Sequence, residues 1–358
     1  MPSLKEIKGR INSISSTLAI TSAMKMVAAA KLQKAQMAIQ NMLPYERRLY
    51  SMLVDLMGAM NISAAASEDG SVRGSGSAER GFDQSGDRLS LSNRHDLAGM
   101  DGAYSLMAQR EVRKVAIVAF ASNSSLCGAF NSNVIREATA VINEYRASGL
   151  GDADITVYSV GRKMAEAMKK LGFPSPADFT KMSDSPSYDA ASALAQELFD
   201  GFVSGRFDKV ELVYNHYKST SSQPTTRQTY LPLSLADATA DLQAGKIADS
   251  ASESDTNRGA ETVGAPVVRQ GSPTTEDLIV EPSKEALIAI LLPKVIRLRI
   301  FTTLLDSAAA EHAARTVAMQ LATDNGNDLL QELTLEYNKG RQQKITSEIL
   351  DLVGGSMQ

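Results

Sequence analysis

Apolar and small residues recur at three- and four-residue steps at both ends of the chain, the spacing of one stripe along a helix. Near the C-terminus the stripe comprises Leu298, Phe301, Leu305, Ala308, Met319, Ala322, Leu329, Leu333, Tyr337, Ile345, Ile349 and Leu352. The first sixty residues keep a heptad spacing that only Lys25 and Glu46 interrupt. A heptad held over this length is typical of a coiled coil. The pattern therefore predicts two long helices, of about 85 and 100 Å if each is continuous.

The two helices are expected to pair with each other. Between Leu305 and Ala322 the C-terminal stripe is built largely from alanine, which allows a partner helix to approach closely. We therefore predict coiled-coil helices over residues 1–60 and 281–358, together forming a protruding rod. Pro44 and Pro293 lie inside these ranges, and each is expected to interrupt or bend its helix.

Two stretches, residues 61–112 and 236–280, lack this periodicity. Both are rich in Gly, Ser and Asp and poor in apolar residues, so they cannot bury enough surface to offset the entropy of ordering. We predict that both are mobile polar insertions or surface loops, and we place no catalytic residue in either.

Between these stretches, residues 113–235 alternate strand and helix patterns. Strands are expected at 114–121, 155–160, 210–217 and 226–233, and helices at 133–146, 162–171 and 190–203. This alternation is typical of a parallel sheet with right-handed crossovers. The predicted fold class is thus α/β: a small central Rossmann-like domain carried on a coiled-coil rod.

Composition and charge limit the possible partners. The 358 residues are 43% hydrophobic, which is enough for a core, and the net charge of -4 with a pI near 5.6 gives no reason to expect nucleic acid. Cys127 is the only cysteine, so an internal disulfide is excluded. No apolar run is long enough to span a bilayer, and the chain opens directly on the amphipathic pattern. We expect no direct membrane insertion.

A central α/β domain raises the possibility of an enzyme, which its residues do not favour. The turn SNSSLCGAFNSN, residues 122–133, has Gly128 as its one glycine, so it carries neither the dinucleotide fingerprint nor the phosphate loop. Cys127 has no histidine with an obvious claim to pair with it, because His95, His216 and His312 are dispersed. We predict no catalytic residue, no cofactor and no metal site.

Three stretches, however, resemble a known family. AEHAARTVAMQLATDNGNDLLQELTLEYNKGRQQKITSEILDLVGG, residues 310–355, is similar to the C-terminal signature of the gamma subunit of F-type ATP synthases. ITSAMKMVAAAKLQKAQ (20–36) and SLCGAFN (125–131) resemble the other two stretches by which that family is known. The three stretches lie in the family order, and together they are highly specific.

The resemblance implies a fold and a role. In this family the terminal helices pair as an antiparallel coiled coil that enters a ring of three alpha and three beta subunits, and the α/β domain lies near the membrane rotor. The implied function is that of a rotor shaft coupling proton flow through the membrane c-ring to ATP synthesis or hydrolysis. The chemistry belongs to the beta subunits, so the chain itself is expected not to be an enzyme. The implied partners are the alpha and beta subunits, the epsilon subunit and the c-ring.

The resemblance also implies site residues. Met24 matches the position near which shaft and beta subunit interact, with Lys25 beside it. Arg315, Arg341 and Gln342 match positions that bond or couple to the beta subunits, and substitutions at the positions of Thr346 and Glu348 disturb coupling. Glu281 matches the foot that meets the c-ring. For each of these residues, coiled-coil packing, a solvated helix face or a plain turn is the competing interpretation.

The chain departs from the family pattern in one turn. Ser124 and Ser125 stand where the family usually has an Arg-Gly pair, so the conformation of that turn is open. Because no transit extension precedes the first helix, the resemblance implies a peripheral protein at the cytoplasmic face of a bacterial inner membrane. Two other interpretations stay open: a structural coiled-coil tether with an α/β recognition module, and a small α/β enzyme that dimerises through its helices.

Overall fold

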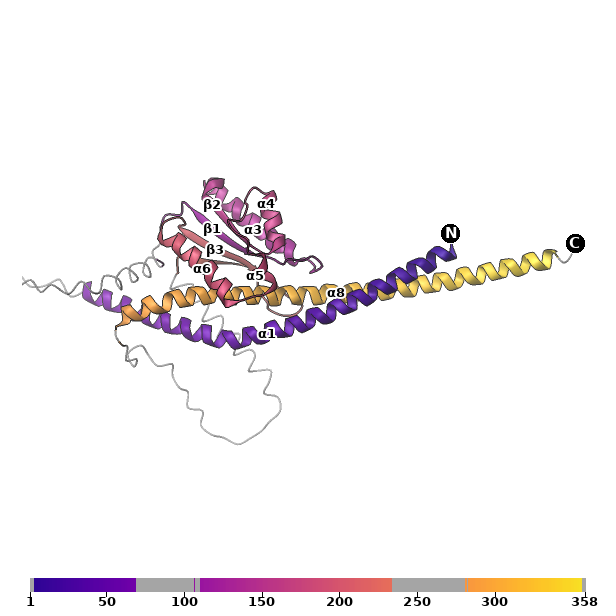
Figure 1. Ribbon diagram of the computed structural model, residues 1–358, viewed down its shortest axis with the longest axis horizontal. Helices are drawn as coiled ribbons and strands as arrows, with labels where there is room; N and C mark the ends of the chain where they lie inside the picture. Colours follow the sequence, from indigo (N-terminus) through magenta and orange to yellow (C-terminus); the bar gives the residue numbers. More distant parts are fainter. Residues whose placement is uncertain (1–2, 69–105, 107–109, 234–280, 282, 356–358) are drawn as a thin grey trace, which may run out of the picture.

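Two long helices form the rod of this protein. The computed structural model describes residues 3–68, 106, 110–233, 281 and 283–355. Helix α1 (Leu4–Glu68) and helix α8 (Lys284–Gly355) lie side by side in opposite directions, so both ends of the chain lie toward the same tip (Figure 1). The predicted pairing of the terminal helices is confirmed.

Contacts along the rod fix the antiparallel register. Thr323 Oγ1 donates a hydrogen bond to Thr21 Oγ1 at 3.1 Å. A Cβ added at Gly326 would lie 2.7 Å from a methyl carbon of Leu18, and one at Gly340 would lie 3.1 Å from a methyl carbon of Leu4. The two glycines are 14 positions apart (340 − 326), as are the two leucines (18 − 4), and 14 positions make two heptads. Leucine of α1 therefore fills the space that glycine leaves in α8.

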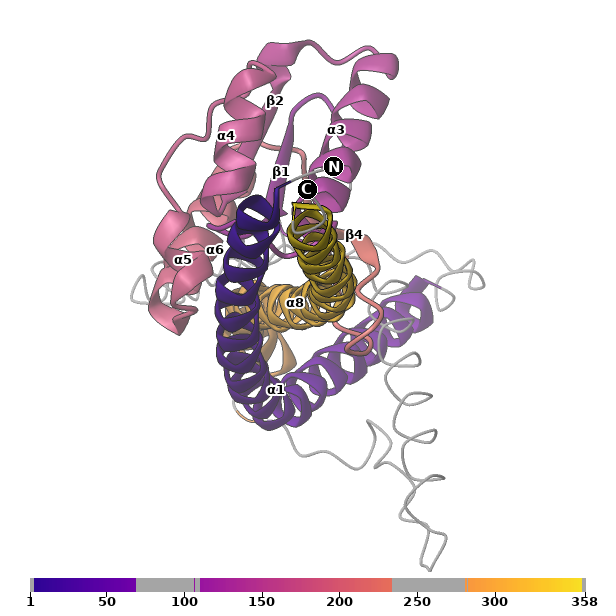
Figure 2. The same cartoon turned by 90° about the vertical axis from the view of Figure 1, so that its right-hand side faces the viewer.

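Both helices continue through their prolines. Pro44 lies inside α1 and Pro293 inside α8, although α1 follows a curved path (Figure 2). Leu49, Leu53, Leu292 and Val295 beside them are buried in the main core. Burial of such side chains, each contributing about 1.5–3 kcal/mol, offsets the hydrogen bond that each proline removes.

Helix α1 extends further than the sequence predicts. It ends at Glu68, so residues 61–68 belong to the helix and not to the predicted insertion. Within the two polar stretches, residues 69–105, 107–109 and 236–280 lie outside the described residues.

The central sheet is mixed. Strands β1 (Val115–Phe120), β2 (Ile155–Val160), β3 (Lys209–Asn215) and β4 (Thr225–Leu231) are arranged in the order β2-β1-β3-β4. Strand β1 pairs in parallel with β2 and with β3, but β4 is antiparallel to β3. The prediction of a wholly parallel sheet is therefore wrong for the last strand. The reason is that residues 216–224 are too few for a crossover, so β3 and β4 form a hairpin.

Helices cover both faces of the sheet. Helices α3 (Phe130–Ala147) and α4 (Arg162–Lys170) lie on one face, and α6 (Tyr188–Val203) with the rod lies on the other (Figures 1 and 2). Two short helices, η2 (Asp152–Asp154) and α5 (Thr180–Asp184), complete the domain. Ala116, Val118 and Phe120 pack in the core shared with the rod, and the alternate residues of β1 pack against α3 and α4. Burial on both faces explains the continuous apolar run of this strand.

Candidate functional site at the joint of rod and sheet

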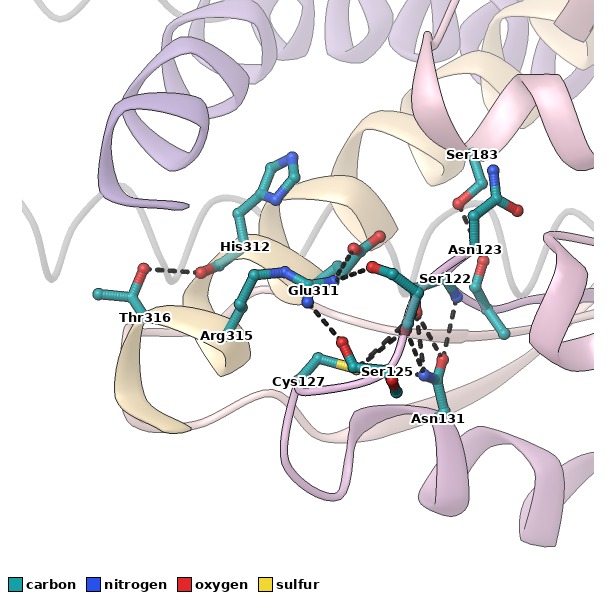
Figure 3. A network of polar contacts seen from close by, with 12 residues as sticks. Ser122, Asn123, Ser125, Cys127, Asn131, Ser183, Glu311, His312, Arg315 and Thr316 are labelled. Atoms are coloured by element: carbon teal, nitrogen blue, oxygen red, sulfur yellow. Dashed lines mark hydrogen bonds and ion pairs between the residues drawn. The ribbon is translucent and has the colours of Figure 1, made fainter. Parts of the chain in front are cut away.

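The loop after β1 lies at the carboxyl ends of the parallel strands. Doubly wound domains bind ligands at this edge of the sheet. Here the loop is held by Asn131, whose Oδ1 accepts a hydrogen bond from Ser122 N at 3.0 Å and whose Nδ2 donates to Ser124 O at 3.2 Å (Figure 3). Ser122 is fully buried. The first residues of the loop are thus tied to the start of α3.

Helix α8 lies over this loop and occupies the edge. The Arg315 guanidinium donates to Ser125 O at 2.6 Å and to Ser124 Oγ at 2.8 Å, and it pairs with Glu311 Oε1 at 2.5 Å (Figure 3). The side chains of Arg315 and Glu311 are both 11% exposed. Burial raises the pKa of Glu311, and the hydrogen bond from Arg315 offsets only part of that effect. The strand edge that could hold a ligand therefore holds the rod.

The loop makes a tight turn with two residues in the left-handed region. Leu126 has φ 67° and is 58% exposed, and Gly128 has φ 58°. Between them Cys127 turns inward to 1% exposure and packs with Phe130 of α3 and with Ala310 of the rod. Cys127 therefore acts as a small apolar packing residue, as buried free cysteines usually do.

A second attachment follows β3. Asp306 of α8 accepts a hydrogen bond from Tyr217 N at 2.9 Å, and its Oδ2 lies 2.6 Å from His216 Nδ1. The hydrogen bond with Asp306 raises the pKa of His216. On the other side, Gln36 of α1 donates to the Tyr217 hydroxyl at 2.6 Å. The loop after β3 therefore contacts both helices of the rod.

The predicted coupling residues fall in three separate places. Met24 and Lys25 are half-buried on α1, and Arg315 is in the joint described above. Arg341, Gln342, Thr346 and Glu348 are exposed on α8 beyond Gly340, which faces Leu4. That segment extends past the start of α1 as a single helix (Figure 1). The four tip residues share one short segment, but the structure does not bring all seven predicted residues together.

Within the tip, two contacts are local. Thr346 Oγ1 donates to Gln342 O at 2.9 Å, and Lys344 Nζ lies 3.8 Å from Glu348 Oε1. Glu281, the predicted foot residue, is exposed in a bend just before α8 begins. It therefore lies at the other end of α8 from the tip.

Several residues of the joint were not predicted from the sequence. Glu311 precedes Arg315 by four positions, the spacing of an ion pair on one helix face, and that spacing could have indicated the pair. Asp306 gives no comparable signal, because its partners are 90 and 89 positions away in a loop that only the folded chain brings close. Asn131 bonds Ser122 only nine positions away, but no regular spacing marks that bond.

His312 should make the stability of the rod depend on pH. Burial lowers the pKa of His312 to about 4, with Lys31 and Arg315 adding to the effect, and its Nδ1 has no hydrogen-bond partner among the described residues. The unfolded chain binds this proton near pH 6.5, so the contribution of His312 to stability is present above that pH. We expect a loss of up to about 3 kcal/mol as the pH falls from about 6.5 to about 4.

Urea unfolding at pH 7.5 and pH 5.0 measures this effect. His312→Gln should reduce the difference in unfolding free energy between the two conditions. His216→Gln is the opposite control, because the raised pKa of His216 stabilises the folded chain at low pH and its removal should enlarge the difference. Equal pH dependence in the wild type and in His312→Gln would show that His312 titrates normally.

The described part of the chain shows neither a metal site nor a membrane span. Within residues 3–68, 106, 110–233, 281 and 283–355, no group of three or more His, Cys, Asp or Glu side chains is placed to hold a metal ion. Among the helices of those same ranges, none is both long enough and apolar enough to cross a membrane.

Comparison with known proteins identifies the family. The family described as ATP synthase matches residues 3–357. The chain is 47% identical to the ATP synthase gamma chain of Phocaeicola vulgatus and 45% identical to that of Bacteroides thetaiotaomicron, in both cases over all of each chain. It is 35% identical to the gamma chain of Flavobacterium johnsoniae, covering 99% of this chain and 98% of the relative.

Solved structures show the same fold at lower identity. A chain of the Euglena gracilis mitochondrial ATP synthase, in a structure of OSCP, F1 and the c-ring, is 18% identical with a TM-score of 0.54 and covers 99% of this chain and 93% of that one. A chain of the rotor of the same enzyme, also 18% identical, gives a TM-score of 0.50 over 96% and 98% of the two chains. Since full-length relatives of well over 30% identity agree with the family match and with the rod-and-sheet fold, this chain belongs to the ATP synthase gamma chain family.

Proposed function

We propose that this chain is the central rotor shaft of an F-type ATP synthase, which couples proton flow through the membrane c-ring to ATP synthesis or hydrolysis at the beta subunits. The observation that carries the proposal is the antiparallel rod, which ends in a single exposed helix at one end and carries the sheet domain on its side. Such a body is asymmetric about its long axis. As it turns, it presents a different side to each surrounding subunit.

Coupling of this kind needs no catalytic residue in the shaft. A rotation that changes contacts with three neighbouring beta subunits changes the relative free energies of their conformations, and hence their nucleotide affinities. The engagement of the strand edge by Arg315 and Glu311 supports a non-catalytic role, since that edge already holds the rod. The ATP chemistry is then carried by the neighbouring subunits.

The contacts of the rod are assigned by position. Arg341, Gln342, Thr346 and Glu348 on the tip are proposed to contact the beta subunits, with Met24 and Lys25 further along the rod. Arg315 instead bonds the loop after β1 of its own chain. Arginine suits reversible contacts of this kind because its planar group forms paired hydrogen bonds with carboxylates and keeps its charge. The exposure of Arg341 and Gln342 leaves them accessible to a surrounding sleeve.

The proposed assembly contains three alpha and three beta subunits, one epsilon subunit and the c-ring. Glu281 is proposed to meet polar loops of the c-ring, consistent with its exposure before α8. The complex is proposed to hold this chain at the cytoplasmic face of a bacterial inner membrane as a peripheral subunit. Sequence relatives named ATP synthase gamma chain, which match the whole chain, support this assignment.

Reconstitution with the alpha and beta subunits of the same organism tests the proposal. We expect one copy of this chain per three alpha-beta pairs and sustained ATP hydrolysis. Replacing Arg341 and Gln342 with alanine should lower the hydrolysis rate roughly tenfold, because a lost charged hydrogen bond costs about 1.5–3 kcal/mol. Asn338→Ala with Lys339→Ala is the matched control, since it removes an amide and a cation from the same exposed helix.

Other outcomes of the reconstitution would favour a different function or a different coupling surface. A stable homodimer that forms no complex would favour a structural tether. A saturable small ligand bound by the sheet domain would favour an enzyme. Equal rates for the Arg341 and Gln342 variant and its control would remove these two residues from the coupling surface.

A further inference from the structure

The seam that α8 forms with α1 and the sheet domain is smooth over part of its length. Between Asp306 and Arg315, the helix presents Ala309, Ala310 and Ala313, all fully buried. Ala309 and Ala313 pack against Leu32 of α1, and Ala310 packs against Cys127 and Phe130 of the domain. Alanine lets surfaces approach closely but gives few side chains that interlock. This part of the seam therefore offers little resistance to sliding or twisting.

Two polar attachments lie at the ends of the smooth seam. We name them the Asp306 clamp, which joins Asp306 to His216 and Tyr217, and the Arg315 clamp, which joins Arg315 to Ser124 and Ser125. They are nine positions apart on α8 (315 − 306), or about 13.5 Å along the helix. One clamp engages the loop after β3 and the other the loop after β1. Hydrogen bonds are directional, so two of them at separate points resist the motions that an alanine surface permits.

The loop after β1, which Arg315 contacts, is itself hydrogen-bonded to the rest of the domain. Arg162 at the start of α4 donates to Asn123 O from Nε at 3.1 Å and from Nη2 at 2.7 Å, and Arg162 N donates to Asn123 Oδ1 at 2.8 Å. A force on α8 is therefore carried through Arg315 and the loop into α4 and the body of the sheet.

We propose that the two clamps add to the apolar core that the sheet domain and the rod share, and that they fix the loops at the carboxyl end of the sheet to α8, so that torque passes between domain and rod without slip. Asp306 and Arg315 are then positioning residues for coupling: they act through the loops of their own chain. The inference rests on the proposed rotor function. It differs from the family expectation for Arg315, which places the partner of that residue on another subunit.

The first test uses the whole ATP synthase, reconstituted in vesicles, and measures ATP-driven ion uptake per ATP hydrolysed. The variant with Asp306→Ala and Arg315→Ala should keep hydrolysing ATP but lose at least about half of its ion uptake per ATP. Arg146→Ala with Asp152→Ala is the matched control, because it removes an Arg–Asp pair of 2.6 Å from the domain surface away from the rod. Asp306→Asn with Arg315→Lys is the milder variant, should the alanine pair fail to assemble, and it should give an intermediate loss.

An engineered disulfide between the loop and α8 distinguishes an internal role of Arg315 from a contact of Arg315 with a neighbouring subunit. A Cβ built at Gly128 lies 3.8 Å from Ala318 Cβ, which is the usual separation across a disulfide. Gly128→Cys and Ala318→Cys are introduced together with Cys127→Ala, so that the two new thiols can pair only with each other. Oxidation should restore uptake per ATP in the clamp-deficient variant, and reduction should abolish it again.

Three outcomes would overturn the clamps. They are full uptake in the clamp-deficient variant, a bridge confirmed by thiol titration that stops uptake when both clamps are intact, and a confirmed bridge that fails to restore uptake. The last would place the partner of Arg315 on another subunit. Failure of the proposed function looks different, because the wild-type complex itself would then not assemble or would hydrolyse ATP without ion uptake.

Discussion

Replacing Gly161 with alanine is expected to prevent the central domain from folding. Gly161 has φ 96°, and a Cβ at this position would lie 2.0 Å from the carbonyl oxygen of Ala121 and 2.8 Å from its carbonyl carbon. Both atoms belong to the backbone at the end of β1, so no side chain can move aside. The expected cost is above about 4 kcal/mol, a large part of the typical stability of a domain.

Gly172 provides the matched control for that substitution. Its φ of 92° is nearly the same, but a Cβ there would meet nothing within 4 Å. Gly172→Ala should therefore cost only the conformational strain, about 1–2 kcal/mol. Because the chain has no tryptophan, far-UV circular dichroism and tyrosine fluorescence are the measurements for urea unfolding. Similar losses in the two variants would show that the close approach of Gly161 to β1 is not the cause.

Replacing Glu211 with alanine is also expected to cause a large loss of stability. This carboxylate on β3 has a side chain only 2% exposed. It accepts hydrogen bonds from the Tyr145 hydroxyl at 2.6 Å and from Arg227 Nε at 2.7 Å, and Lys209 Nζ lies 2.7 Å away. Glu211→Ala would leave two largely buried cations without this carboxylate. We expect a loss of about 3–5 kcal/mol in the free energy of unfolding.

Glu144→Gln is the control for Glu211→Ala. Glu144 also pairs with Arg227, but its side chain is 61% exposed, so its loss should cost no more than about 1 kcal/mol. The comparison is made by urea unfolding at pH 7. If both variants lose the same stability, burial of the carboxylate does not determine its contribution.

The pH dependence of Glu211 has a definite sign. Burial alone would raise its pKa, but hydrogen bonds from Arg227, Lys209 and Tyr145 outweigh burial and hold the pKa below the ordinary value of 4.5. The unfolded chain therefore binds the proton first. The contribution of Glu211 is present above about pH 4.5 and is lost as the pH falls through the lower folded-state pKa.

The parts of the fold that depend on local pattern could be predicted from the sequence. The heptads indicated the rod, and the strand expected at 155–160 has the bounds of β2. The direction of β4 could not be read from its own residues, since it depends on the short connection from β3. The same is true of the prolines, because burial of the flanking leucines decides whether each helix continues.

The candidate site was predictable only in part. The tip residues from Arg341 to Glu348 are identified by resemblance, and the fold shows only that they are exposed. The conformation of the turn at Ser124 and Ser125 could not be predicted from the sequence. In the folded chain the Ser124 hydroxyl and the Ser125 carbonyl accept hydrogen bonds from Arg315, which is 191 and 190 positions away.

The antiparallel register of the rod also sets the order in which the protein can form. The hydrogen bond between Thr21 and Thr323 joins residues 302 positions apart, so α1 is made long before its partner exists. At a synthesis rate of 5–20 residues per second, the apolar stripe of α1 waits roughly 15–60 s for α8. Pairings of such high contact order also form slowly once both helices are present. The rod is therefore expected to close last, and unpaired α1 should be a binding site for chaperones until it does.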